Sequence, residues 1–394
     1  MTDFYERSLI VHQQLRGKIG IVGKMPVTSH DDLSLAYTPG VARPCEVIAS
    51  DQSKTRNLTI KCNSVAVVSD GSAVLGLGNI GPYAAIPVME GKALLFKEFS
   101  NIDAWPICLD TQEVDEIVET VRRIAPVFGG INLEDISAPR CFAIEQQLQD
   151  IGIPVFHDDQ HGTAIVLLAA LINATRVLGR DIAKLHVVIC GAGAAGTAIA
   201  RLLRCVGHDP NICVPCVPVE DVVVCDSRGA IHKGRDHLTE YKQEMLKYTN
   251  RQNRSGTLQE VIVGADVFIG VSKGNLLTAE DISKMADNSI VLAMANPIPE
   301  IMPDEAKRGG AAVVGTGRSD FPNQINNVLV FPGIFRGALD SGASRITQEM
   351  QIAAAHALAS ATQNPSTELV LPDPLDRSVA HQIATAVIKA ANQE

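Results

Sequence analysis

Two carboxylates lie side by side between two histidines in the stretch FHDDQHGTA, residues 156–164. The acids are Asp158 and Asp159, and the histidines are His157 and His161. The apolar segment IGIPVF precedes them and the small-residue run AIVLLAALINA follows, which predicts a buried strand with the acids at its end and then a helix that packs away. Burying two adjacent carboxylates is costly unless a cation meets them. The stretch therefore predicts a site for a divalent metal.

A second acid pair, Glu134-Asp135, ends another short apolar segment about 24 residues earlier. The intervening CFAIEQQLQDIG predicts a helix, so the two acid pairs are expected to end consecutive strands joined by a helical crossover. Parallel strands of that kind place their ends side by side. Three or four convergent carboxylates are hard oxygen ligands, which suit Mg²⁺ or Mn²⁺. The two histidines favour zinc only if both rings point at the acids.

A lysine, Lys92, lies on the apolar face of a helix predicted over residues 83–99. At about 100° per residue, that face consists of Ala85, Val88, Met89, Phe96 and Phe99. Periodicity alone favours a lysine that extends along the apolar surface to reach solvent. The alternative is a buried lysine whose pKa is lowered, so that it is available as a base.

The sequence GAGAAG, residues 191–196, has the full setting of a dinucleotide-binding turn. The strand LHVVIC precedes it, the helix TAIARLLRCVG follows, and the strand VVVCD then ends in Asp226. In such a βαβ unit the helix N-terminus receives the pyrophosphate and the acid holds a ribose hydroxyl. The expected backbone contacts come from Gly191, Gly193, Ala194, Ala195 and Gly196. The insertion GHDPNICVPCVPVE places Asp226 further along the chain than the usual spacing of about 20 residues.

The residues after that strand leave the choice of cofactor open. Asp226 favours the 2′-hydroxyl of NAD, whereas Ser227 and Arg228 directly after it suit a 2′-phosphate. We expect NADP or NAD, with a slight preference for NADP.

A second glycine-rich match, GLGNIG at 76–81, lacks this setting. It ends the run VAVVSDGSAVLGLGNIG, residues 65–81, which predicts a β-hairpin turned at Asp70-Gly71. We therefore interpret it as a tight turn that packs close to a ligand rather than as a second nucleotide site.

Further polar residues adjoin expected turns and strand ends. Residues 1–25 are predicted to be helical, and Tyr37 precedes a helix that should begin at Val41 or Ala42, a pattern typical of an ordinary loop aromatic. Asn296 and the pair Asn326-Asn327 lie at or after later strands, where ligand contacts gather in open α/β sheets, although Asn is also a common turn residue. The later strands are expected within 267–272, 290–300 and 312–320, and helices from residue 346.

Composition sets limits on the class of protein. The 394 residues predict two or three domains, and a net charge of −10 without a basic block argues against a nucleic-acid surface. The first residues lack the apolar core of a signal peptide, and we expect no membrane span. The nine scattered cysteines favour a reducing cytoplasm over a disulfide framework. We interpret Cys213 and Cys216 as an inert loop pair rather than half a zinc site or a redox pair.

Eight motifs, taken in order, resemble the malic enzyme family over nearly the whole chain. They are YTPGVA (37–42), GLGNIG (76–81), GKALLFKEF (91–99), NLEDI (132–136), FHDDQHGT (156–163), GAGAAG (191–196), ANPIPE (295–300) and NQINNVLVFPGIFRGAL (323–339). The wording HDDQHGT is similar to that of the short bacterial and archaeal branch.

The resemblance implies roles for residues of this chain. Glu134, Asp135 and Asp159 would bind the divalent metal, and Asp158 would support them without binding it directly. Lys92 would be the general base and Tyr37 the general acid. Asn296 and Asn326 would hold the substrate, and Asn296 is also an expected cofactor contact.

The implied reaction is the oxidative decarboxylation of (S)-malate to pyruvate and CO₂ with reduction of NAD(P)⁺. Lys92 would remove the hydroxyl proton while C2 gives hydride to the nicotinamide, and Tyr37 would protonate C3 of the enol after CO₂ leaves. Long eukaryotic members carry a carboxylate-binding Arg after the Asp-Gly, but here Ser72 and Ala73 follow it. The 76–81 turn or Arg318 is the expected replacement.

The expected architecture is α/β: a catalytic, metal-binding domain over 1–160, a Rossmann-type doubly wound domain over 161–345, and C-terminal helices over 346–394 that pack back on the first domain. The resemblance implies a homodimer or dimer of dimers, with Tyr37 available to complete a site across the subunit boundary. The alternatives are a malolactic enzyme, which retains the cofactor and releases lactate, and a nucleotide-sensing protein without turnover.

Overall fold

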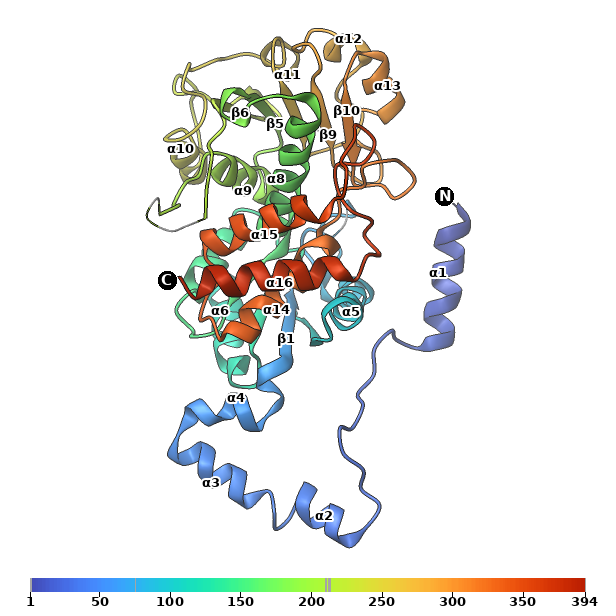
Figure 1. Cartoon of the computed structure of the whole chain (residues 1–394), viewed down its shortest axis with the longest axis vertical. Coiled ribbons are helices and arrows are strands. Elements are labelled where there is room, and N and C mark those ends of the chain that lie inside the picture. Colours follow the sequence, from blue (N-terminus) through green and yellow to red (C-terminus); the bar gives the residue numbers. More distant parts are fainter. Residues whose placement is uncertain (1, 75, 210, 212–213, 394) are drawn as a thin grey trace.

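The computed structural model describes residues 2–74, 76–209, 211 and 214–393, and it arranges them as two α/β units with an N-terminal arm (Figure 1). The first unit has a parallel sheet in the order β2-β1-β3-β4. Its strands are β1 (Ser64–Ser69), β2 (Asp103–Cys108), β3 (Gly130–Leu133) and β4 (Val155–His157). Its helices are α5 (Gly81–Ser100), α6 (Val114–Ile124) and α7 (Arg140–Leu148). The crossovers between consecutive strands make this an α/β unit, as predicted.

The two faces of the first sheet carry different cores because successive strand residues point to opposite sides. Val65 and Val67 of β1 pack with Met89 and Phe96 of α5 in the largest cluster. Ala66 and Val68, which alternate with them, belong to a separate cluster that includes residues of α6 and α7. Helix α5 therefore lies on the face that also meets the rest of the molecule.

The second unit is the doubly wound sheet expected from GAGAAG, in the order β10-β9-β8-β5-β6-β7. All its pairings are parallel except the one between β6 and β7. Its strands are β5 (His186–Cys190), β6 (Asp221–Asp226), β7 (Gly229–Ala230), β8 (Val267–Gly270), β9 (Ile290–Ala293) and β10 (Val313–Thr316). Its helices are α9 (Ala194–Leu203), α10 (Glu240–Met245), α11 (Leu258–Val261), α12 (Ala279–Ile282) and α13 (Pro303–Arg308).

Helix α8 (Asp158–Leu178) joins the two units and lies in the core that they share. It is long and apolar enough to cross a membrane, but 67% of its most apolar window is buried within the protein. Its apolarity therefore reflects its place against α9 and α15 (Gln348–Ala361). Three C-terminal helices complete this layer: α15 packs on α16 (Ser378–Ala391), and α16 packs on α14 (Phe331–Ser341), which in turn contacts α5. These contacts tie the last part of the chain to both units.

Residues 2–63 form an extended arm that leaves the body (Figure 1). It carries α1 (Thr2–Leu15), α2 (His30–Ala36), α3 (Ala42–Ser50), α4 (Thr55–Leu58) and the 3₁₀ turns η1 (Gln52–Lys54) and η2 (Ile60–Asn63). The start of α3 is as predicted, but the prediction of helix over residues 1–25 is wrong beyond Leu15. No side chain described between residues 4 and 63 is buried.

Two further sequence predictions are wrong. No hairpin with β1 forms in the described residues 70–74 and 76–81, because parallel strands β2 and β3 occupy both edges of β1. That segment is a compact loop in which the Gly71 carbonyl accepts from the amides of Ile80 and Gly81. The interpretation of Cys216 as half of an inert loop pair also fails, since Cys205 and Cys216 are bonded across the insertion after α9. Cys216 is thus not an inert partner of Cys213, which lies outside the described residues.

Candidate active site

The two acid pairs meet beyond one edge of the first sheet, as the strand order requires. Leu133, the last residue of β3, is paired with His157, the last residue of β4. The acid pairs that directly follow these two residues therefore lie next to one another. One carboxylate oxygen from each of Glu134, Asp135 and Asp159 lies within 4.8 Å of the other two. The backbone N–H of Asp135 also donates to Asp159 Oδ2 at 2.8 Å. This is a compact oxygen-rich group suited to a hard divalent cation.

The buried charge of this group supports the same conclusion. Four carboxylates gather here, from Glu134, Asp135, Asp158 and Asp159, against one ammonium group. Burial raises the pKa of Glu134 well above its usual range; Lys92 opposes this, and the neighbouring acids add to it. Burial likewise raises the pKa of Asp158, against the effect of Lys92. A divalent cation would offset this repulsion, so the residues fit the metal that the sequence predicts.

Asp158 faces the lysine and is not part of the group formed by Glu134, Asp135 and Asp159. It is fully buried, and its Oδ2 accepts from Lys92 Nζ at 2.6 Å and from Asn327 Nδ2 at 3.1 Å. Its Oδ1 lies against the backbone of Gly162, one turn along α8, where a Cβ would come within 1.9 Å. Glycine at this position gives the Asp158 carboxylate the space it occupies.

The Lys92 side chain is only 10% exposed and its ammonium group is paired with carboxylates, which excludes the solvent-reaching alternative. Its Nζ lies 2.6 Å from Asp158, 2.8 Å from Glu134 Oε1 and 4.1 Å from the centre of the Phe331 ring. Burial by itself lowers the pKa of Lys92, but Asp158 and Glu134 outweigh it and the pKa is raised. Without a cation at the acids, the pKa of Lys92 is therefore raised rather than lowered, because periodicity located the lysine but not its two carboxylate partners.

The two histidines do not join the acids as metal ligands. His161 Nε2 lies 2.9 and 3.0 Å from the two carboxylate oxygens of Glu145 in α7. His157 is fully buried, and its Nε2 lies 3.5 Å from Asp159 Oδ2. With one ring turned toward Glu145, the histidine pair does not make the zinc site considered from the sequence.

The GAGAAG turn has the shape expected for a dinucleotide. A Cβ on Gly191 would lie 2.5 Å from the carbonyl oxygen of Val271, and one on Gly196 would lie 1.8 Å from that of Gly191. At Gly193 a Cβ would meet nothing within 4 Å. The outer glycines are thus required by packing, whereas Gly193 faces open space at the N-terminus of α9, where Ala194 and Ala195 begin the helix. A pyrophosphate fits that space.

Asp226 ends β6 with both of its carboxylate oxygens engaged. Oδ1 accepts from the Arg228 backbone N–H at 2.9 Å, and Oδ2 lies 2.5 Å from Arg235 and 2.7 Å from Lys242. Burial opposes ionisation, but these hydrogen bonds lower the pKa of Asp226 to about 2. Ser227 and the Arg228 side chain are exposed beside it. The positive partners Arg235 and Lys242 had no signal in the sequence, because they come from later loops and α10.

The asparagines separate into distinct positions. Asn327, in the turn η5 (Asn327–Leu329), binds Asp158, while the Asn326 side chain caps that turn by accepting from the Val328 amide at 3.0 Å. Asn296 is exposed, and its carbonyl lies against Gly76 of the GLGNIG loop, so that loop does pack against the second unit. Arg318, an expected carboxylate contact, is paired with Asp320 at 2.6 and 2.8 Å. A further residue, Asn132, orients Glu134 by donating to its Oε2 at 2.9 Å.

Tyr37 is the one expected catalytic residue that this chain does not bring to the group. It caps the end of α2 in the arm, with 69% of its surface exposed (Figure 1). Among the residues described, no hydrogen bond links its side chain to the acids or to Lys92, which lies in α5 within the body.

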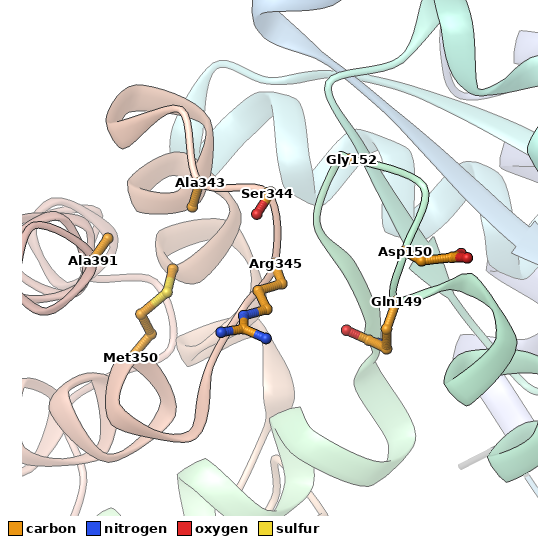
Figure 2. A pocket seen from close by; sticks show the side chains of 8 residues that line it. All are labelled: Gln149, Asp150, Gly152, Ala343, Ser344, Arg345, Met350 and Ala391. Carbon is orange, nitrogen blue, oxygen red and sulfur yellow. The ribbon is translucent and has the colours of Figure 1, made fainter. Parts of the chain in front are cut away.

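A separate hollow of about 400 Å³ lies between the 149–152 loop and the start of α15 (Figure 2). Arg345 extends into it from one side, and Gln149 and Asp150 lie on the other. Its lining contains none of the residues assigned above, so it is distinct from the acid cluster.

Comparison with known proteins agrees with these features. Residues 16–149 match the malic enzyme N-terminal domain and residues 160–392 match the malic enzyme NAD-binding domain. The chain is 54% identical to a bifunctional malic/malolactic enzyme of Bacillus subtilis, over 98% of this chain and 92% of that protein. It is 53% identical to an NAD-dependent malic enzyme of Geobacillus stearothermophilus, over 98% of this chain and 78% of that protein. A solved NAD-dependent malic enzyme from Thermotoga maritima superposes with a TM-score of 0.91 at 47% identity, covering 96% of this chain and 98% of that one.

Proposed function

We propose, from the premise that this chain belongs to the malic enzyme family, that its acid cluster, Lys92 and GAGAAG turn carry out the family reaction. That reaction is the oxidative decarboxylation of malate to pyruvate and CO₂ with reduction of NAD⁺ or NADP⁺. The observation that carries the proposal is the convergence of Glu134, Asp135 and Asp159, the first two of them buried, beside Lys92. A redox cofactor site without these groups would have no means to assist loss of CO₂.

We assign the site residues as follows. Glu134, Asp135 and Asp159 hold Mg²⁺ or Mn²⁺, which when bound polarises the substrate hydroxyl and carbonyl oxygens. Asp158 fixes the Lys92 ammonium group through their 2.6 Å hydrogen bond. As the neutral amine, Lys92 takes the proton from the C2 hydroxyl; its own proton has to leave first, and a cation bound by the acids would favour that loss by offsetting their charge. The dinucleotide that the GAGAAG turn would hold would supply the hydride acceptor. Asn296 and Asn326 contact the substrate from the second unit.

The proton for C3 of the product comes from Tyr37, and we propose that it acts in the site of a second copy of the chain. The arm supports this: residues 4–63 include exposed apolar side chains such as Phe4, Ile21 and Leu35, at 72%, 81% and 72% exposure. Apolar surface of this extent on an extended segment is typical of a subunit interface. We therefore propose a homodimer or dimer of dimers that works in the cytoplasm.

The cofactor site supports acceptance of NADP as well as NAD. Arg235 and Lys242 already neutralise Asp226, and the exposed Arg228 adds a further positive charge at the ribose end. We therefore propose that a 2′-phosphate is tolerated there. The ratio of kcat/KM for the two cofactors, in wild type and in Arg228→Ala, tests this assignment, and an unchanged ratio would contradict it.

The central experiment follows absorbance at 340 nm with malate, Mn²⁺ and each cofactor. Appearance of NADH or NADPH with stoichiometric pyruvate and CO₂ supports the proposal. Its absence, with metal and cofactor both bound, would refute it. Lys92→Ala should lose turnover while keeping cofactor affinity; retention of near wild-type turnover would remove Lys92 as the base.

A malolactic activity is the second candidate, favoured by the relative from Bacillus subtilis whose name includes it. It predicts lactate from malate without net accumulation of reduced cofactor. Assaying lactate and absorbance in one reaction separates the two activities.

Mixed dimers test the role of Tyr37. Tyr37→Phe and Lys92→Ala parents are each expected to be inactive. If Tyr37 acts across the boundary, their mixed dimer contains one site with both residues intact and regains up to about half of the activity. A mixed dimer as inactive as its parents would count against sharing of the site.

A further inference from the structure

Glu145, a residue with no role in the reaction described above, holds the turn that carries two of the site acids. It projects from α7, and its side chain is only 12% exposed. Its carboxylate accepts from the His157 backbone N–H at 3.1 Å and from Gln160 Nε2 at 3.1 Å. His161 Nε2 lies within 3.0 Å of both of its oxygens. One carboxylate thus binds three groups within the first turn of α8 and the residue before it.

These three donors bracket Asp158 and Asp159 in the chain. Helix α8 begins without a side-chain cap from its own N-cap residue, His157. The first turn of a helix has unsatisfied backbone N–H groups and frays unless something fixes it. Here Glu145 binds the N-cap amide from another helix, which is the part that a local acid plays in a capping box.

The Glu145 contacts lie on the side of the turn away from the metal-binding acids. A cavity of about 580 Å³ borders Glu145, Gln160 and His161, and its lining contains none of Lys92, Glu134, Asp135, Asp158 or Asp159. Without Glu145, the Gln160 and His161 side chains would lose their carboxylate partner on the side of the turn that borders this cavity. Asp158, in turn, is fixed by Lys92 and Asn327 on the opposite side. Hydrogen bonds therefore fix the start of α8 from two sides, and those on one side are made by Glu145.

We propose that Glu145 is a positioning residue for the metal site, which orients Asp159 as a ligand by fixing His157, Gln160 and His161. This rests on the proposal that Glu134, Asp135 and Asp159 bind Mn²⁺ or Mg²⁺. Residues that orient metal ligands without binding the metal typically account for about 10- to 100-fold in metal affinity. Glu145 acts through the helix start and does not touch substrate.

The test is Mn²⁺ affinity, measured by calorimetry on the full-length chain without substrate or cofactor. Glu145→Gln keeps the size of the side chain but offers only one acceptor oxygen to the three donors, and it should weaken Mn²⁺ binding by about 10- to 100-fold. At saturating Mn²⁺, its kcat should return toward the wild-type value, because the ligands themselves remain. A structural role alone would lower the melting temperature without moving the dissociation constant.

Glu349 offers a matched control. It is also a buried glutamate, which accepts from the backbone N–H of Asp209 at 3.0 Å and lies 3.6 Å from His208. Glu349→Gln should lower the melting temperature and leave Mn²⁺ affinity unchanged. His161→Gln, which keeps a donor toward Glu145, should bind Mn²⁺ nearly as wild type does, whereas His161→Leu should not.

The outcomes are distinguishable. If Glu145→Gln binds Mn²⁺ as tightly as wild type, the inference is overturned. If Glu145→Gln does not fold, the pair His161→Gln and His161→Leu decides, and equal affinities in that pair overturn it as well. If the wild-type chain binds no Mn²⁺, the metal site itself fails and with it the proposed function.

Discussion

The space beside Gly162 gives the sharpest prediction. A Cβ at this position would lie 1.9 Å from Asp158 Oδ1 and 2.8 Å from its Cγ. An ordinary contact begins near 3.4 Å, so the carboxylate has to retreat by about 1.5 Å. It cannot do so freely, because Lys92 at 2.6 Å and Asn327 at 3.1 Å hold its other oxygen. Gly162→Ala should therefore break the hydrogen bond between Asp158 and Lys92.

The expected loss in kcat is on the order of 100-fold, since a displacement of about 1 Å at a catalytic group can cost that much. Stability should also fall, because a hydrogen bond to a buried carboxylate is broken, and the helix preference for alanine over glycine, about 0.5–1 kcal/mol, offsets only part of that loss. The assay is kcat at saturating malate, cofactor and Mn²⁺, together with the melting temperature.

Gly91→Ala is the control for the helix effect. Gly91 also lies inside a long helix, α5, and a Cβ there meets Lys18 Nζ at an ordinary 3.5 Å. It should keep wild-type kcat. If Gly162→Ala is well folded and fully active, the site does not depend on Asp158 lying against Gly162, and the reasoning is refuted.

Three other predictions use different parts of the molecule. Gly193→Val should raise the Kd for NAD(P) at least about 10-fold without lowering the melting temperature, because the new side chain enters open space where only a ligand would meet it; unchanged affinity would contradict the assigned cofactor position. Cys216→Ser should lower the free energy of unfolding by about 2–4 kcal/mol in the absence of reductant and have no such effect in its presence, because the bond to Cys205 closes a short loop; equal effects in both conditions would show that the bond does not form. Asp226→Asn should be less stable than wild type above about pH 4, and the difference should shrink as the pH falls. The reason is that a carboxylate whose folded-state pKa is lowered to about 2 stabilises the fold above its ordinary pKa and loses that contribution as the pH falls toward 2. Urea unfolding at several pH values measures this difference, and a difference that grows in acid would contradict the argument.

Local pattern and strand order were sufficient to predict the acid cluster. Glu134-Asp135 and Asp158-Asp159 each end a short apolar strand, and parallel pairing then leaves little freedom in where they meet. The Rossmann unit followed for the same reason, because the glycine turn and the strands on either side of it lie within one stretch of chain. Its strands β5 and β6 pair in parallel as expected.

Features that depend on distant parts of the chain were not predictable. The prediction of a hairpin after β1 failed because the sequence of that segment does not show that β2 and β3 pair with both edges of β1. The partners of Lys92 and the bond between Cys205 and Cys216 depend on tertiary proximity. The contacts of Glu145 with the start of α8 could not be predicted either, since a single glutamate on a helix is usually exposed to solvent.

Helix α8 has a consequence for how such a chain can be divided or recombined. The two matched domains span residues 16–149 and 160–392, and Asp158 and Asp159 lie between them, at the start of a helix whose body is in the shared core. A chimera joined before Asp158 would pair Asp158 and Asp159 with Glu134 and Glu145 of the other parent, whereas one joined just after Asp159 would pair them with Asn327 of the other parent. Crossovers within 150–160 should thus yield folded but weakly metallated hybrids, whereas crossovers that keep α7, β4 and the first turn of α8 from one parent should preserve activity.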